Sequence, residues 1–177
     1  MIEVVLRAVR VDVGSSTPLL LLEEVQGERV LPIYIGAPEA ASIAYALQGV
    51  SAPRPMTHDL LGDVITALRA RLFSVEITSL VDNTFFAMLR LLRDQHEIMV
   101  SARPSDAVAL ALRVGAPILV ADELMAAEGK VLQLAYDEDD DDEDDNAYEP
   151  FDASAQADLV AQFEEFLDQV KPEDFGQ

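Results

Sequence analysis

One order of elements occurs twice along this chain: three strand-like segments are followed by an Ala-rich helix that begins at a proline. Hydrophobic alternation and apolar runs, separated by turn residues, predict the first strands at residues 3–13, 19–25 and 30–35. The same pattern returns at residues 73–80, 85–92 and 96–102. Pro38 opens a helix that extends to about Leu47, and Pro104 opens a helix that ends at Gly115. The chain therefore contains two related strand-strand-strand-helix units.

The two units predict a single α+β domain with a mixed β-sheet over residues 1–136. A helix at residues 57–71, with Thr57 as its N-cap, is inserted between them, and a strand at 117–120 and a helix at 122–128 follow. The N-termini of the two helices that begin at prolines are expected at related positions on the sheet. Because apolar residues occur on both sides of several strands, we also expect a homodimer or larger assembly.

Negative charge is concentrated behind the predicted domain. The chain has a net charge of −21, of which residues 1–136 contribute 11 − 16 = −5 and residues 137–177 contribute 1 − 17 = −16. Every residue from 137 to 145 is acidic, so residues 137–152 are predicted to form a disordered linker. A domain at −5 lacks the broad positive field that non-specific nucleic-acid binding needs, but a few arginines suffice to hold one phosphate.

Residues 153–177 are predicted to form an amphipathic helix behind this linker. Its apolar face consists of Leu159, Phe163, Phe166 and Val170. Such a helix either docks on its own domain or binds a protein partner or a second subunit.

Several classes of protein are excluded or disfavoured by composition. The chain has no cysteine, which excludes disulfides, thiolate metal sites and a thiol nucleophile. No apolar run approaches the roughly eighteen residues that a membrane span needs. The N-terminal segment alternates like a strand and has Glu3 where a signal peptide has basic residues. We therefore expect a cytoplasmic protein without membrane segments.

Three polar segments interrupt the apolar pattern, at residues 36–39, 54–59 and 103–106. Each lies at a predicted helix N-terminus, where free N–H groups and the helix dipole favour an anion. Arg54 and Arg103 precede their helices and suit bidentate phosphate binding. His58 could transfer a proton near neutral pH. A hard divalent cation, Mg²⁺ or Mn²⁺, could be held by the carboxylates of Asp106, Asp59 and Glu39.

Each of these residues also has an ordinary structural interpretation. An acidic residue in the first turn, such as Glu39 or Asp59, stabilises a helix by about 0.3–1 kcal/mol without any further role. Arg103 could be only the surface ion-pair partner of Asp106, three residues later. His58 at a helix start is often a plain hydrogen-bonding residue. The prolines on both sides of Arg54 restrict how its side chain is presented, which favours a specific role.

Four short motifs follow one another within residues 1–130. They are LPIYIG at 31–36 followed by Glu39-Ala40, RPMTHDL at 54–60, DNTFFA at 82–87, and ARPSDA at 102–107 followed by ALA at 109–111. This set resembles the bifunctional nuclease (BFN) domain family, whose members are expected to cut RNA and DNA. Asn83 and Phe86 replace the glycine and tyrosine of the family pattern. Asn83 should be tolerated because Asn adopts left-handed turn conformations readily.

The resemblance implies a nuclease site on the matching motif positions. They are Glu39, Arg54, Thr57, His58, Asp59, Arg103, Ser105 and Asp106. In this hypothesis Arg54 and Arg103 clamp the scissile phosphate beside Thr57 and Ser105. Asp106, with Asp59 or Glu39, holds Mg²⁺ or Mn²⁺, and His58 transfers the proton.

Two further expectations accompany this hypothesis. The acidic tail could compete with substrate for the arginines. The alternative to a nuclease is a non-catalytic regulatory module that binds an anionic ligand or the carboxylate of a protein partner. The nuclease hypothesis requires that the three polar segments, distant in the chain, meet in one cleft.

Overall fold

The computed structural model describes residues 1–50, 52–131 and 148–151. Its strands are β1 (Ile2–Asp12), β2 (Thr17–Glu24), β3 (Arg29–Tyr34), β4 (Arg71–Val81), β5 (Thr84–Arg93), β6 (His96–Ala102), β7 (Ile118–Val120), β8 (Lys130–Val131) and β9 (Tyr148–Pro150). Its helices are α1 (Ala37–Leu47), α2 (Thr57–Ala67), α3 (Pro104–Val114) and α4 (Asp122–Glu128). Among these residues no helix combines the length and the hydrophobicity that crossing a membrane requires. The predicted tail helix at 153–177 lies outside the described residues.

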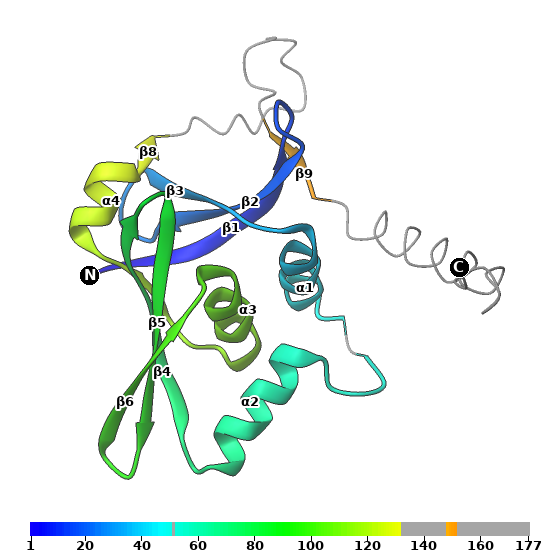
Figure 1. Ribbon diagram of the computed structural model, residues 1–177, viewed down its shortest axis with the longest axis vertical. Helices are drawn as coiled ribbons and strands as arrows, with labels where there is room; N and C mark the ends of the chain where they lie inside the picture. The colour runs from blue at the N-terminus through cyan, green and yellow to red at the C-terminus, as the bar shows by residue number, and fades with distance from the viewer. Residues whose placement is uncertain (51, 132–147, 152–177) are drawn as a thin grey trace, which may run out of the picture.

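The strands form one mixed sheet in the order β6-β5-β4-β7-β1-β2-β3-β8, and β9 pairs with the end of β1 (Figure 1). All neighbouring strands are antiparallel except β4 and β7, which are parallel. The predicted units are therefore two three-stranded meanders, β1–β3 and β4–β6, on either side of β7. Each meander is followed by its helix, which confirms the α+β fold with two strand-strand-strand-helix units.

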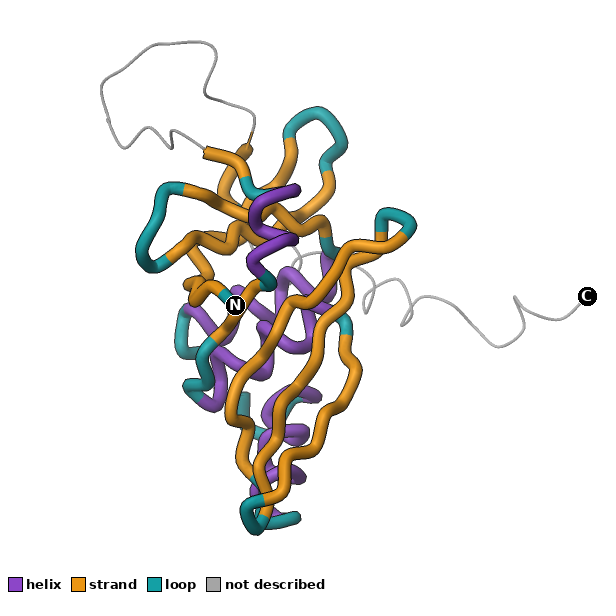
Figure 2. Tube along the Cα trace, turned by 90° about the vertical axis from the view of Figure 1, so that its left-hand side faces the viewer, coloured by secondary structure: helices purple, strands orange, loops and turns teal. Residues whose placement is uncertain are grey.

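Helix α3 is the central element of the core. It packs against α1, α2, β4 and β5, and Figure 2 shows α1, α2 and α3 grouped behind the long strands. Residues 107–111 of α3 are at most 1% exposed, so this helix is buried around most of its circumference. Three of these five residues are alanines, whose small side chains let neighbouring helices approach closely. This close packing brings the N-terminal turns of α1 and α3 together.

Several predicted boundaries differ from the structure. The helix expected at 57–71 ends at Ala67, because Arg69 takes a left-handed backbone conformation (φ 56°) and β4 begins at Arg71. Thr57 is the first helical residue, and the N-cap is Met56. Residues 148–150 form β9, so the sheet includes residues beyond the predicted domain limit of 136 and inside the segment predicted to be disordered.

The turn between β4 and β5 has the predicted left-handed conformation. Asp82 and Asn83 have φ values of 49° and 59°. Asparagine is one of the few non-glycine residues that tolerate this region, so the replacement of the family's glycine is compatible with the turn.

Candidate functional site

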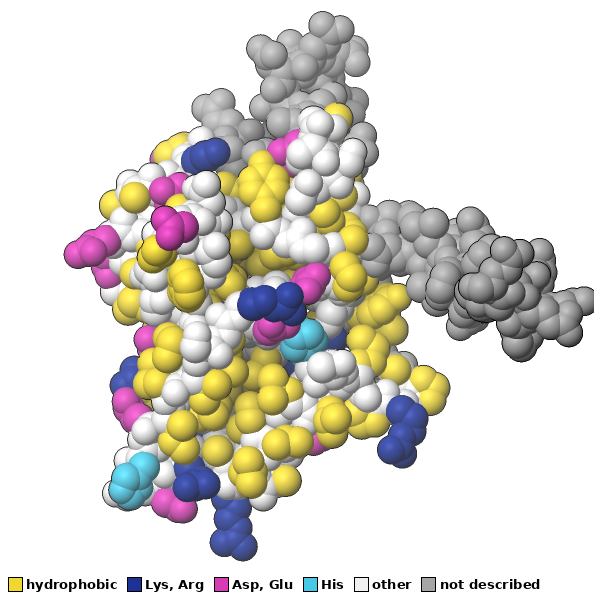
Figure 3. Space-filling view, viewed as in Figure 1, with side chains coloured by type: hydrophobic (Ala, Val, Ile, Leu, Met, Phe, Trp, Pro, Cys, Tyr) yellow, Lys and Arg dark blue, Asp and Glu magenta, His cyan; other side chains and the backbone are white. Residues whose placement is uncertain are grey.

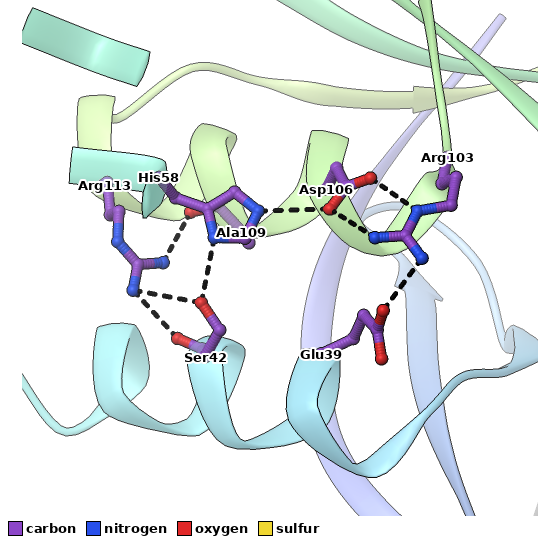
Figure 4. A network of polar contacts seen from close by, with 7 residues as sticks. All are labelled: Glu39, Ser42, His58, Arg103, Asp106, Ala109 and Arg113. Carbon is purple, nitrogen blue, oxygen red and sulfur yellow. Dashed lines mark hydrogen bonds and ion pairs between the residues drawn. The ribbon is translucent and has the colours of Figure 1, made fainter. Parts of the chain in front are cut away.

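The three polar segments meet where α1, α2 and α3 pack together. Arg103 donates a hydrogen bond to Glu39 of α1 (2.8 Å), and Asp106 lies 3.2 Å from His58 of α2 (Figure 4). The three segments 36–39, 54–59 and 103–106 therefore lie close together, as expected, and each contributes at least one residue to these contacts. Figure 3 shows charged side chains and a histidine gathered near the middle of a largely apolar face.

Arg103 is the centre of this network. It is the N-cap of α3 with an extended backbone, so its side chain projects beside the first turn, where Asp106 also lies. Its Nε and Nη2 donate to the two carboxylate oxygens of Asp106 at 2.7 and 3.0 Å, and its Nη1 donates to Glu39. These bonds use three of the five N–H donors of the guanidinium. Two donors remain, and the side chain is 64% exposed.

Hydrogen bonds set the charge state of the Arg103–Asp106 pair. Those from Arg103 lower the pKa of Asp106 below its ordinary value, against the opposing effect of partial burial, and the bond to His58 acts in the same direction. Asp106, and after it Glu39, raises the pKa of Arg103. Asp106 is therefore an anion at neutral pH, and Arg103 is a cation.

Both ring nitrogens of His58 have polar partners. Nε2 lies 3.2 Å from Asp106 Oδ1, and Nδ1 lies 3.0 Å from Ser42 Oγ. An ionised carboxylate only accepts hydrogen bonds, so in the neutral imidazole the proton is assigned to Nε2. Nδ1 then accepts the hydrogen bond that the Ser42 hydroxyl donates. The side chain of His58 is only 13% exposed, which holds the ring in this orientation.

Arg113, in the last turn of α3, is a second arginine of the network that the sequence did not single out. Its Nε donates to Asp59 (2.6 Å), Nη1 to the Ala109 carbonyl (2.9 Å), and Nη2 to the carbonyl (3.0 Å) and Oγ (3.3 Å) of Ser42. The side chain is 11% exposed. The sequence does contain a feature that could have identified Arg113. It is the only charged residue after Asp106 in this apolar helix, and it lies two turns later on the same face.

Two hollows flank the Glu39–Arg103 bond. The first, of about 390 Å³, is also lined by Tyr34, Gly36, Asn83, Thr84 and Ser105, and we call it the Tyr34 hollow. The second, of about 320 Å³, is also lined by Pro38, Ser42, Met56, Thr57, His58 and Asp106, and we call it the Ser42 hollow. The two predicted hydroxyl residues, Ser105 and Thr57, therefore lie in different hollows on either side of Arg103.

Two predicted site residues, Arg54 and Asp59, line neither hollow. Arg54 is exposed, lines neither hollow, and makes no hydrogen bond or ion pair with any described residue. Asp59 accepts hydrogen bonds from the Met56 N–H (2.9 Å) and from Arg113. The Met56 bond, and after it the Arg113 bond, lowers the pKa of Asp59. Asp59 thus closes the first turn of α2 and binds α3, because it lies on a different side of α2 from His58.

The predicted metal ligands are not gathered as a metal site. No group of three or more acidic or histidine side chains among the described residues is placed to hold an ion. The carboxylates of Glu39 and Asp106 are bonded to Arg103, and that of Asp59 is bonded to Arg113. A cation bound by Glu39 and Asp106 would have to displace the guanidinium that is now bonded to both carboxylates. In this arrangement the residues do not fit the expected Mg²⁺ or Mn²⁺ site.

The fold and the network define a small α+β domain whose paired helix N-termini carry arginine, carboxylate and histidine side chains. Its sequence matches the family model of the bifunctional nuclease domain over residues 20–133. The chain belongs to the bifunctional nuclease domain family.

Named relatives fall into two groups. Uncharacterized proteins from two strains of Mycobacterium tuberculosis are 45% identical over 173 residues, which cover 98% of this chain and 97% of theirs. Bifunctional nuclease 1 of rice (Oryza sativa subsp. japonica) is 25% identical over 126 residues, which cover 69% of this chain and 38% of the rice protein. The likeness to a named nuclease is therefore distant and confined to part of that protein.

Proposed function

We propose that this protein is a nuclease that hydrolyses phosphodiester bonds of RNA or DNA in the Ser42 hollow. The observation that carries the proposal is the placement of His58 between Asp106 and Ser42, with the Arg103 guanidinium beside it. A partly buried imidazole oriented by a carboxylate is a suitable general base or acid. Membership of the bifunctional nuclease domain family, and the distant likeness to rice bifunctional nuclease 1, support the same activity.

The substrate phosphate would bind at Arg103. This side chain keeps two N–H donors and most of its surface in contact with solvent. Thr57 lines the Ser42 hollow and Ser105 lines the Tyr34 hollow, and Arg103 lines both. A nucleic-acid strand that crosses the Glu39–Arg103 bond would therefore place one phosphate at Arg103 and neighbouring groups in the two hollows.

The charge balance of the network predicts weak substrate binding. Arg103 and Arg113 carry two positive charges, whereas Glu39, Asp59 and Asp106 carry three negative charges. A phosphodiester would compete with Glu39 for Arg103 and would gain no strong attraction from the site as a whole. No catalytic step is assigned to a metal ion, because the carboxylates that would hold it are bonded to arginine.

The same charge balance favours the alternative function, a non-catalytic module. If Arg103 exchanges Glu39 for the carboxylate of a partner or for a small anion, the network becomes a regulated binding site without hydrolysis. The histidine distinguishes the two functions, because an anion-binding module does not need an imidazole whose Nδ1 faces a hydroxyl group in the hollow.

Cleavage of end-labelled RNA and DNA by the full chain tests the proposal. The chain has two histidines, so His96→Ala, on an exposed strand end, is the matched control for His58→Ala. We expect His58→Ala to reduce cleavage about 10²–10⁴-fold, the usual contribution of a general acid or base, and His96→Ala to leave it unchanged. Equal cleavage by wild type and His58→Ala would contradict the proposal, and absence of cleavage by wild type would favour the binding module.

A further inference from the structure

Ser42 is a site residue that none of the sequence motifs contains. It lies on α1 one turn after Glu39, is half-buried, and lines the Ser42 hollow. Serine side chains inside helices commonly bond the carbonyl of the preceding turn. The recorded partners of this Oγ lie on the other two helices instead: His58 Nδ1 of α2 at 3.0 Å and Arg113 Nη2 of α3 at 3.3 Å.

These contacts form a continuous chain from hydroxyl to imidazole to carboxylate. Asp106 fixes the ring of His58 through Nε2, and the opposite nitrogen, Nδ1, faces Ser42 Oγ. A nucleophilic serine needs a base within hydrogen-bond distance and a third group that orients the base. Ser42, His58 and Asp106 satisfy both conditions, although the two ring nitrogens exchange the places they have in the serine proteases.

We propose that Ser42 is the nucleophile of this site and forms a covalent phosphoserine intermediate; the inference rests on the proposed nuclease function. In the first step Ser42 Oγ bonds to phosphorus, and the bond from phosphorus to one bridging oxygen breaks. The hydroxyl proton passes to His58 Nδ1 and then to the leaving oxygen. In the second step water attacks phosphorus and gives a proton to Nδ1, the Oγ–P bond breaks, and this proton returns to Ser42 Oγ. The net reaction consumes one water molecule.

The two arginines have separate roles in this scheme. Arg113 donates to Ser42 Oγ and so stabilises the negative charge that develops on the attacking oxygen. It also bonds the Ser42 carbonyl and is largely buried, which makes it a positioning residue for α1. Arg103 faces solvent and is the arginine available to the non-bridging oxygens of the substrate. In this scheme water is the second nucleophile, and all the catalytic groups are protein side chains.

The competing interpretation is that Ser42 only orients His58 while water attacks phosphorus directly. The two schemes differ in the number of displacements at phosphorus. A covalent intermediate requires two displacements, which retain configuration, whereas direct attack by water inverts it. The configuration at phosphorus therefore distinguishes the two schemes. If Ser42 only positions His58, the product has inverted configuration.

The experiment uses the full wild-type chain with bis(4-nitrophenyl) phosphate and with a dinucleotide phosphorothioate of single configuration in isotopically labelled water. We expect a burst of 4-nitrophenolate close to one equivalent per chain, a phosphoryl adduct on Ser42 after an acid quench, and retention of configuration. Ser42→Ala should cleave at least about 100-fold more slowly than wild type and give no adduct. Ser101→Ala, an exposed serine of β6, is the matched control and should match wild type.

The outcomes separate this inference from the proposed function. Inversion of configuration, or cleavage by folded Ser42→Ala within about tenfold of wild type, would overturn the nucleophile while leaving a His58-dependent nuclease intact. If wild type cleaves no phosphodiester, both proposals fail together. The stereochemical measurement uses wild type, so it decides the question even if Ser42→Ala does not fold.

Discussion

Replacement of Arg113 by methionine should destabilise the domain substantially, although Arg113 belongs to none of the family motifs. The guanidinium connects all three helices of the site: it lies on α3, bonds Asp59 of α2 and bonds Ser42 of α1. Methionine keeps the apolar stem of the side chain and removes only the charged group. The loss in stability therefore reports the polar contacts themselves.

The expected loss is about 3 kcal/mol. The bond to Asp59 is charge-assisted, but Asp59 is 40% exposed and keeps the Met56 N–H as a partner, so about 1.5 kcal/mol is appropriate. The bonds to the Ser42 and Ala109 carbonyls add about 0.5–1 kcal/mol each, because both residues lie inside helices, where the carbonyl also accepts an intrahelical hydrogen bond. With a urea dependence of about 2 kcal/mol/M, the unfolding midpoint should fall by roughly 1.5 M.

Urea unfolding followed by far-UV circular dichroism measures this loss, since the chain has no tryptophan. Arg93→Met, at the exposed end of β5, is the control and should change the free energy of unfolding by less than about 0.5 kcal/mol. A double-mutant cycle with Asp59→Asn should give a coupling energy of about 1 kcal/mol. If Arg113→Met costs less than about 1 kcal/mol, or the cycle shows no coupling, the guanidinium does not hold the three helices together.

Two further predictions concern the carboxylates. Because Arg103 is bonded to the carboxylates of both Glu39 and Asp106, millimolar Mn²⁺ should leave the melting temperature of wild type unchanged; a rise that disappears in Asp106→Ala would show that an ion displaces Arg103. The lowered pKa of Asp106 stabilises the fold above the ordinary value of 3.8, and this contribution is lost as pH falls toward the lowered value. The stability difference between wild type and Asp106→Asn should therefore be constant above about pH 5 and shrink as the pH falls below that value, and a difference that stays constant on acidification would contradict the ionic role of Asp106.

Local sequence patterns were sufficient for most of the fold. Alternation with a period of two residues marked the strands, and the prolines at 38 and 104 marked the starts of α1 and α3, because these signals act over a few neighbouring residues. The predicted element boundaries were wrong where a residue adopts a backbone conformation that is rare for its type, or where a strand pairs with a distant segment. Arg69 ends α2 in the conformation usually taken by glycine, so no stop signal was visible. The strand β9 pairs with β1 across a long separation in sequence, which no local pattern reports.

The motifs also predicted which segments form the polar network, because residues of 36–39, 54–59 and 103–106 all contribute to it. Only the tertiary structure decided which side chains face one another. Neighbours in sequence point about 100° apart around a helix, so His58 turns to Asp106 while Asp59 turns to Arg113. Ser42 and Arg113 enter the site because α1, α2 and α3 pack against one another, and that packing depends on contacts between residues far apart in the chain.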